Sequence, residues 1–342
     1  FKVDLTSEAT DAVMLKSLRS SMFAIVALNI FNVQTAESAP AFQLVNDDRV
    51  VLLGDTFFER AQRYGWLETA IQLRFPEEKI QFRNLGWSGD TVFAESRGIF
   101  DPPAKGCARM LEQVRDLKPT VIMLNYGCNE AFNGPSYIDT FVKQYGQLLD
   151  DLSTTKARMV LVSPLPLFNA GAPLPKPEKH NAVRKQFVEA VQQLAKDRAL
   201  HFVDIWTPVE QKLDLLSAKR VTEEGVHLTD FGYGIVSTIF AGALTGDSND
   251  ATPSTEFGPS IAMLDVEELR QTIVEKNEMY FYRWRPQNVT YLFLFRKHEQ
   301  GNNAKEVDDF LPIISRLEEK IFELKGKPQK VSGEIIRKSD NS

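Results

Sequence analysis

Short apolar runs alternate with helical patterns between about residues 48 and 245. Runs rich in apolar and β-branched residues predict five strands, at 50–53, 80–85, 121–126, 159–163 and 202–205. Apolar residues at helical spacing predict helices between and after them, at 58–75, 137–152, 181–199 and 230–244. Strands that alternate with helices form a parallel sheet with helices on both faces. The pattern therefore predicts a three-layer α/β/α sandwich with a five-stranded parallel sheet, as one domain over residues 42–246.

The chain after residue 246 follows a different pattern. Residues 247–260 are rich in Ser, Asp, Pro and Gly and predict a linker or surface loop. We expect a helical and aromatic extension over 261–325, with helices at 263–277 and 310–324 and an aromatic, basic stretch at 280–288. Residues 326–342 are polar and predict a disordered tail.

The composition limits the classes of function. With 342 residues and 43% hydrophobic content, the chain can bury the core of a large domain with an appendage. Its net charge of −6 argues against a nucleic-acid partner. No apolar run reaches the roughly 18 residues of a transmembrane span. The two cysteines and four histidines lack metal-ligand spacings, so we expect no metal and no cofactor. Nothing in the sequence predicts the oligomeric state.

The N-terminal region has the pattern of an export signal. Lys16 and Arg19 precede a short apolar stretch at 22–28, and small residues follow up to Ala39-Pro40-Ala41. This order of charged, apolar and small residues is typical of a cleaved signal peptide. We therefore expect residues 1–41 to be a signal peptide with its upstream segment, Met14 to be the start, and the mature protein to be periplasmic or secreted. The alternatives are a start-site artefact and an amphipathic helix packed on the domain.

The two cysteines allow two interpretations. Cys107 is expected near the start of a helix and Cys128 at the end of the strand that follows it. Because those two ends meet at one edge of an α/β sheet, a disulfide is compatible with an oxidising compartment. Two reduced, half-buried thiols are the alternative.

Four separate segments supply the groups that acyl transfer needs. The first strand leads through Gly54-Asp55 to Thr56, whose hydroxyl is expected at a strand end, beside a helix N-terminus. A glycine-rich segment, 84–91, follows the second strand, and 125–130 ends the third. Glu224 lies three residues before His227, from where a carboxylate can orient the imidazole. The segments thus offer a nucleophile, oxyanion donors, a base and a group that orients the base.

Each segment has a simpler interpretation when taken alone. Residues 54–56 are compatible with a capped strand-to-helix turn, and residues 84–90 with an ordinary turn. His227 is compatible with a loop histidine that has no chemical role. All the segments together, in this order and each at a strand end or loop, favour the catalytic interpretation.

In this order and spacing, residues 48–245 resemble the SGNH (GDSL-type) hydrolase family. The resemblance implies a flavodoxin-like SGNH fold and an esterase. It implies that Thr56 stands in the position of the nucleophile, His227 in that of the base and Glu224 in that of the acid that orients the base. It also implies an oxyanion hole formed by Gly89, Asn129 and the Thr56 backbone N–H.

Three residues depart from the family pattern: Thr56 replaces serine, Glu224 replaces aspartate, and the third block ends in Glu130. The extra methylene of Glu224 still leaves a carboxylate that can face His227. Thr56 matters most because its β-methyl restricts χ1 and takes space beside the scissile carbonyl. A misplacement of about 1 Å can cost on the order of a hundredfold in rate.

The aromatic stretch of the extension adds candidates for substrate binding. Trp284 and Arg285, with Asp55 and Trp87 of the domain, are hydrogen-bonding or aromatic groups that a carbohydrate could contact. The extension resembles one that follows SGNH-type domains in exported proteins of planctomycete-type bacteria. An appendage docked through its aromatic residues is the alternative.

Two functions remain open from the sequence. The first is an exported carboxyl-ester hydrolase, such as a carbohydrate O-deacetylase, that acts on a small-molecule or carbohydrate ester. The second is a catalytically inactive SGNH-fold protein that binds glycans or serves as a scaffold, which the replacements at Thr56 and Glu224 would favour. A protein-interaction role for the extension is a further hypothesis.

Overall fold

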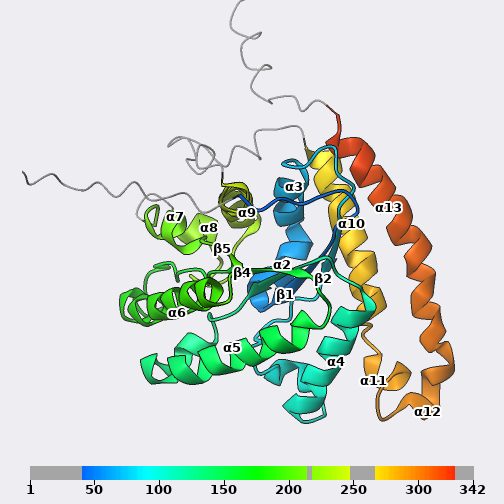
Figure 1. Cartoon of the computed structure of the whole chain (residues 1–342), viewed down its shortest axis with the longest axis horizontal. Helices are drawn as coiled ribbons and strands as arrows, with labels where there is room; N and C mark the ends of the chain where they lie inside the picture. Colours follow the sequence, from blue (N-terminus) through cyan, green and yellow to red (C-terminus); the bar gives the residue numbers. More distant parts are fainter. Residues whose placement is uncertain (1–40, 214–217, 247–265, 328–342) are drawn as a thin grey trace, which may run out of the picture. The chain divides into compact units, whose positions relative to one another are not determined.

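The computed structural model describes residues 41–213, 218–246 and 266–327 (Figure 1). The described residues belong to one compact unit. The predicted signal peptide, the predicted linker at 247–260 and most of the predicted tail lie outside the described residues. None of the helices in the described ranges has the length and apolar content needed to cross a bilayer.

A five-stranded sheet forms the centre of the fold. Its strands are β1 (Arg49–Gly54), β2 (Gln81–Asn84), β3 (Val121–Asn125), β4 (Arg158–Val162) and β5 (His201–Val203). All pairs are parallel and the order is β2-β1-β3-β4-β5. The predicted fold class is therefore confirmed, and each strand lies within two residues of its predicted bounds. Because the order reverses at β1, the carboxyl ends of β1 and β3 form the switch point where such sheets hold their sites.

The helices follow the strands in the expected order. They are α2 (Thr56–Tyr64), α3 (Trp66–Gln72), α4 (Pro103–Asp116), α5 (Ile138–Ser153), α6 (Glu178–Asp197), α7 (Trp206–Glu210), α8 (Ala218–Val221) and α9 (Asp230–Thr245), with the 3₁₀ turn η1 (Glu95–Gly98) before α4. The single helix predicted at 58–75 is two helices, because Gly65 between them adopts a left-handed conformation with φ of 72°. This residue ends one helix and begins the next.

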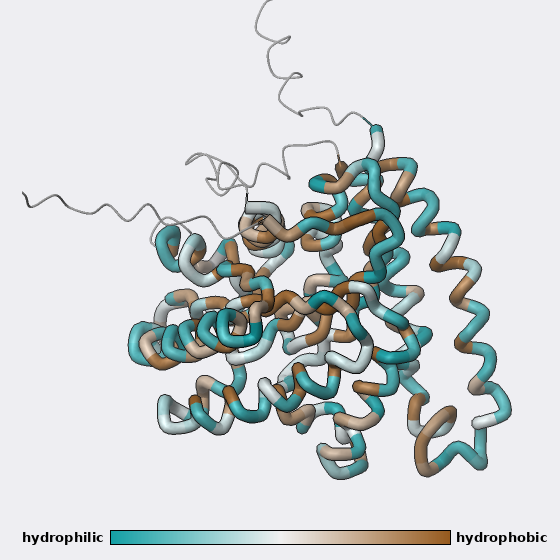
Figure 2. Tube along the Cα trace, in the orientation of Figure 1, coloured by the Kyte–Doolittle hydropathy of each residue, from teal (hydrophilic) through white to brown (hydrophobic). Residues whose placement is uncertain are grey.

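Alternate residues of the strands face opposite layers. In β1, Val50 and Leu52 belong to a core shared with α2, α3 and α9, whereas Val51 and Leu53 belong to a core shared with α4, α5 and α6. All four side chains are buried. Figure 2 shows the hydrophobic segments concentrated along the strands and the hydrophilic colour on the outer helices. The sheet therefore lies between two helical layers.

The extension consists of α10 (Glu267–Trp284), α11 (Val289–Leu292), α12 (Lys297–Gln300) and α13 (Phe310–Lys325). Helices α10 and α13 lie side by side (Figure 1), and α10 packs against α2, α3 and the edge strand β2. The Lys276 ammonium is buried, 2.7 Å from Glu68 and 3.3 Å from the carbonyl of Phe82 in β2. Since an exposed edge strand invites pairing with other chains, α10 protects the sheet.

Candidate active site

The Thr56 hydroxyl lies where β1 passes into α2. β1 ends at Gly54, where a Cβ atom would lie 2.4 Å from the carbonyl oxygen of Asn125, so the close approach of β1 and β3 requires glycine. Asp55 is the N-cap of α2 and accepts a hydrogen bond from the Phe57 N–H at 3.0 Å. Thr56 is the first residue of α2. Its own N–H is among the helix's first donors, which have no partner within the helix.

The glycine-rich loop after β2 meets this hydroxyl. The Gly89 N–H donates to Thr56 Oγ1 at 3.1 Å, and Gly89 has a φ of 71°, which favours glycine. The Asn129 side-chain amide donates to the carbonyl of Asp90 at 2.7 Å. This bond uses one of the two amide hydrogens, so the second is available to another acceptor. The loop after β2 thus contacts both Thr56, through Gly89, and the predicted oxyanion donor Asn129, through Asp90.

Glu130 supports this arrangement from below. Its carboxylate is buried and accepts hydrogen bonds from the N–H groups of Val92 at 2.9 Å and Gly127 at 2.8 Å. These bonds tie the loop after β2 to the loop after β3. The departure from the family pattern at Glu130 therefore places a carboxylate that holds backbone in position.

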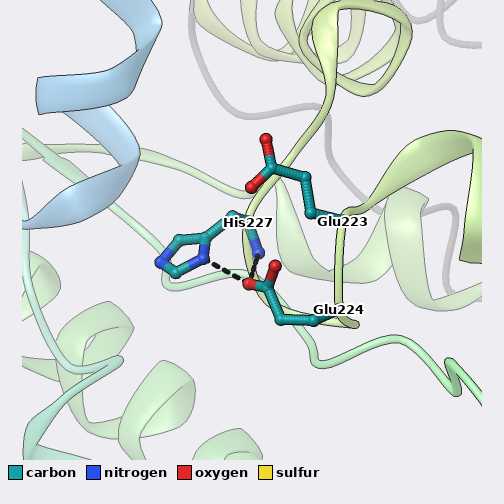
Figure 3. Close-up of side chains that lie close together, drawn as sticks. All are labelled: Glu223, Glu224 and His227. Atoms are coloured by element: carbon teal, nitrogen blue, oxygen red, sulfur yellow. Dashed lines mark hydrogen bonds and ion pairs between the residues drawn. The ribbon is translucent and has the colours of Figure 1, made fainter.

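His227 and Glu224 form the predicted pair. Figure 3 shows the Nδ1 side of the imidazole directed at the Glu224 carboxylate, and the other ring nitrogen pointing away from it. The same Glu224 oxygen also accepts the His227 backbone N–H at 3.1 Å. A carboxylate that accepts from Nδ1–H leaves Nε2 as the acceptor of the neutral ring. The glutamate therefore performs the orienting contact that an aspartate would make.

An ion pair joins the histidine loop to α2. Glu223, the neighbour of Glu224, lies 2.7 Å from the Arg60 guanidinium. Within the described residues, no hydrogen bond links Thr56 to the His227 ring. Catalytic hydrogen bonds are often long without ligand, and the Arg60–Glu223 pair ties the loop of His227 to the helix that begins at Thr56.

Glu223, Glu224 and His227 are also the described residues whose donor atoms could hold a metal ion, since these atoms lie within 4.8 Å of one another. Figure 3 shows that Glu224 is engaged with the imidazole. Arg60 supplies a positive charge to Glu223. Both carboxylates therefore have a partner within the chain.

Burial alters the acids beneath the site. It raises the pKa of Asp55 to about 6, opposed by the hydrogen bond from Phe57. It raises the pKa of Glu130 to about 7, opposed by the hydrogen bond from Val92. Burial also raises the pKa of Asp90, which the Arg97 guanidinium at 2.6 Å opposes. The interior below Thr56 is thus a region where charge is costly.

The four candidates for substrate binding lie in two places. Asp55 is buried and caps α2. Trp284 is also buried and meets Trp87 edge-on at 6.0 Å. Arg285 lies with its guanidinium carbon 3.5 Å from the centre of the Trp87 ring. Three of the four therefore form one cluster between the extension and the loop after β2.

Sequence reasoning missed Glu59 and the buried Arg97, which hold the glycine-rich loop. Arg97 binds Asp90 at 2.6 Å and the carbonyl of Leu85 at 2.8 Å. The only sequence feature that could have indicated their role is a charged residue near apolar ones. Many exposed charged residues share this feature, so it does not identify buried ones. The cysteines, by contrast, match the second interpretation: Cys107 and Cys128 are free and half-buried.

The hydroxyl of Thr56 lies at the switch point of a parallel sheet, where it accepts from a backbone N–H, and a separate loop carries a Glu–His pair; these features are typical of an α/β-fold hydrolase. The model of the GDSL-like lipase/acylhydrolase family matches residues 53–235. The chain therefore belongs to the GDSL-like lipase/acylhydrolase family, as the resemblance implied.

Several solved structures are similar in fold. An acetylxylan esterase from Geobacillus stearothermophilus is 18% identical with a TM-score of 0.48, covering 62% of this chain and 100% of its own. An α/β hydrolase from the metagenome of Lake Arreo is 17% identical with a TM-score of 0.48, covering 60% and 98%. A GDSL-like lipase described from Parabacteroides merdae is 18% identical with a TM-score of 0.48, covering 60% and 100%. No curated protein matches. Likenesses at this level assign no substrate to this chain.

Proposed function

We propose that the protein hydrolyses carboxyl esters through Thr56. The Thr56 oxygen attacks the acyl carbon while His227 Nε2 takes the hydroxyl proton, and the same proton passes to the departing alcohol. Water then attacks the threonine ester while His227 takes its proton, and that proton passes to Thr56 Oγ1 as the acid is released. Glu224 stabilises the imidazolium. The N–H groups of Gly89 and Thr56 and the Asn129 amide bind the oxyanion. The reaction requires no cofactor.

The observation that carries this proposal is the hydrogen bond from the Gly89 N–H to Thr56 Oγ1 at 3.1 Å. The amide is the donor in this bond, so the proton of the hydroxyl remains available to a base. The bond also holds the threonine oxygen beside the donors that must receive the oxyanion. A β-branched side chain with a restricted χ1 suits a hydroxyl that needs one orientation.

The substrate class rests on the sequence. We propose a short-chain acyl ester, with a carbohydrate as its alcohol and the periplasm or the exterior as its location. The export pattern before residue 42 supports the location, and family membership supports the ester. Hydrolysis of an acetylated oligosaccharide, compared with an unglycosylated aryl acetate, measures whether the sugar contributes to kcat/KM.

The test of the reaction compares three variants on an aryl acetate. Thr56→Val keeps the branched shape and removes the hydroxyl, and His227→Ala removes the base; each should lower kcat/KM by roughly a thousandfold or more. Thr56→Ser should be at least as active as the parent, since it keeps the hydroxyl and removes the methyl.

Equal rates for the parent and His227→Ala would contradict the proposal. A parent protein that binds glycans without hydrolysing any ester, and still binds them as His227→Ala, would instead support the inactive glycan-binding alternative. Loss of hydrolysis in Thr56→Val, next to an active parent, would show that the hydroxyl carries the reaction and that surface groups do not.

A further inference from the structure

One arginine of the extension reaches the catalytic domain. Arg285 is the C-cap of α10, where the helix ends with φ of −132°. Its guanidinium leaves the extension, donates to Glu59 of α2 at 3.0 Å and lies 3.5 Å from the centre of the Trp87 ring. A planar guanidinium is suited to binding a carboxylate and covering an indole at once, which an ammonium is not. Arg285 therefore contacts both the helix of the nucleophile and the loop of the oxyanion donor.

Glu59 passes this contact on to the loop. One of its oxygens receives Arg285 Nη1, and the other accepts the N–H of Ser88 at 2.6 Å as well as the Ser88 hydroxyl. The Glu59 side chain is only 8% exposed. A buried carboxylate needs its full set of partners, because an unpaired buried charge is costly. Without Arg285, the buried Glu59 carboxylate would lose its cation. Its position beside Ser88 would then be less favourable than one exposed to water.

Ser88 is the residue before Gly89. Its backbone is held by Glu59 on one side, while the Gly89 N–H on the other side donates to Thr56 Oγ1. The N–H that Glu59 binds and the N–H that serves as oxyanion donor thus belong to adjacent residues. Small shifts there matter, because an oxyanion donor works only at hydrogen-bond distance from the place where charge develops.

The aromatic cluster packs against the loop that carries Gly89. Besides Arg285, the Trp87 ring has the Arg97 guanidinium 5.6 Å from its centre and the edge of Trp284 at 6.0 Å. A cavity of about 710 Å³ lies alongside, between α4 and the extension. The cavity walls include Trp87 and Arg285, but both are already engaged with protein groups.

We propose that Arg285 is a positioning residue for the oxyanion hole, acting through Glu59 and Ser88 on the N–H of Gly89. The extension thereby completes the site of the preceding domain. The inference rests on the proposed ester hydrolysis for its catalytic consequence, whereas the positioning itself is independent of turnover.

The first experiment measures the loop directly. Hydrogen–deuterium exchange of the peptide spanning residues 84–92 is compared among the full-length parent, Arg285→Ala and Arg283→Ala. Arg283 lies on the same helix but pairs with Asp308 of the extension at 2.8 Å. Exchange in this peptide should rise in Arg285→Ala and stay at the parental rate in Arg283→Ala. Unchanged exchange in Arg285→Ala would overturn the inference, whatever the esterase activity.

The second experiment measures the catalytic consequence. Arg285→Ala should lower kcat on an aryl acetate roughly 10- to 100-fold with little change in KM, because the lost interaction acts in the transition state. Arg285→Lys should recover part of the loss, since it keeps the charge for Glu59 but not the planar contact. Added guanidinium, far below denaturing concentration, should restore part of kcat in Arg285→Ala alone.

The two experiments separate the possible failures. A parent without esterase activity would refute the proposed function, and the exchange data would still decide whether Arg285 positions the loop. An active parent with equal kcat in Arg285→Ala and Arg283→Ala would refute the inference and leave the proposed function intact. A raised KM with unchanged kcat would assign Arg285 to substrate binding and also contradict its positioning role.

Discussion

Asp55 combines two tasks at one residue. One carboxylate oxygen caps α2 through the Phe57 N–H, and the other is buried without a partner in the described structure. Burial is the largest cause of its raised pKa, about 6 against an ordinary 3.8. A proton on the unpartnered oxygen removes the buried charge. The residue next to the nucleophile is thus best tolerated in its neutral form.

This leads to a prediction about the pH dependence of stability. Because the folded-state pKa lies above the unfolded value, Asp55 contributes stability that is fully present below pH 3.8 and is lost as the pH rises through about 6. Asp55→Asn keeps the cap and cannot ionise. The unfolding free energy of Asp55→Asn relative to the parent should therefore increase by roughly 2–3 kcal/mol between pH 4 and pH 7. Melting temperatures of the two proteins, compared over this range, measure the change.

Asp101→Asn is the matched control for that prediction. Its pKa is lowered, first by a hydrogen bond from Arg109, so its stabilising effect is present above its ordinary pKa and lost as the pH falls. Between pH 4 and pH 7 the difference in melting temperature between Asp101→Asn and the parent should therefore stay nearly constant, because the effect of Asp101 is lost only below its ordinary pKa of 3.8. A constant difference in melting temperature between Asp55→Asn and the parent across this range would contradict the assignment.

The break between α2 and α3 shows how one position shapes an element. The periodicity of 58–75 is continuous, and an isolated glycine inside a helical pattern is usually tolerated. Here Gly65 has a positive φ, and a Cβ atom on it would lie 2.9 Å from Val274 and 3.0 Å from the carbonyl of Arg270. Both of these neighbours belong to α10, so the extension packs closely against the residue at which α2 ends.

We therefore predict that Gly65→Ala destabilises the protein by about 1–3 kcal/mol, through the left-handed conformation and the contact with α10. Denaturant unfolding measures the change. Gly246→Ala is the comparison for the first cause, because Gly246 ends α9 in the same left-handed conformation, with φ of 69° and ψ of 13°. A loss no greater than that of Gly246→Ala would show that α10 does not constrain the break.

Other elements follow from local pattern with small errors. α5 and α9 begin and end within one residue of their predicted bounds, and α6 begins three residues earlier. α10 is displaced further, since it runs from Glu267 to Trp284 and includes part of the aromatic stretch. Its polar residues Lys276 and Asn277 are buried, so the hydrophobic pattern alone gave its limits poorly.

At the scale of the whole molecule, the extension and the domain share buried charges. The Lys276–Glu68 pair joins α10 to α3 with both side chains almost fully buried. Arg83 of β2 pairs with Glu318 of α13, and Lys325 donates to Gln72 at 2.6 Å. These contacts lie on the side of the sheet edge that α10 covers. The contacts of the extension therefore contribute to the folding stability of the domain.

We predict that Lys276→Ala costs about 3–5 kcal/mol of unfolding free energy, because it leaves the Glu68 carboxylate buried without its cation. Combining Lys276→Met with Glu68→Gln should recover most of the loss, since no charge then remains. Lys320→Ala, which breaks the exposed pair with Glu268, should cost at most about 1 kcal/mol. Equal effects of Lys276→Ala and Lys320→Ala in denaturant unfolding would contradict this view.

The sequence by itself determined the class of fold and the order, along the chain, of the four segments that carry the candidate site residues. Apolar runs predict the strands. Sites form at the carboxyl ends of parallel strands, and this rule places Thr56, Gly89 and Asn129 at one edge of the sheet. The Glu224–His227 pair was also within reach of the sequence, because its two members are three residues apart and share a loop.

Only the tertiary structure decided how the extension meets the site. Arg285 and Glu59 are 226 residues apart, and Lys276 and Glu68 are 208 apart. No local periodicity encodes such pairs, since each charge by itself has the pattern of a solvated residue. Their partners are chosen by the packing of α10 on β2, and that packing depends on the shape of the whole core. The local pattern thus defines the elements, and the burial of distant charges against each other defines how the site is completed.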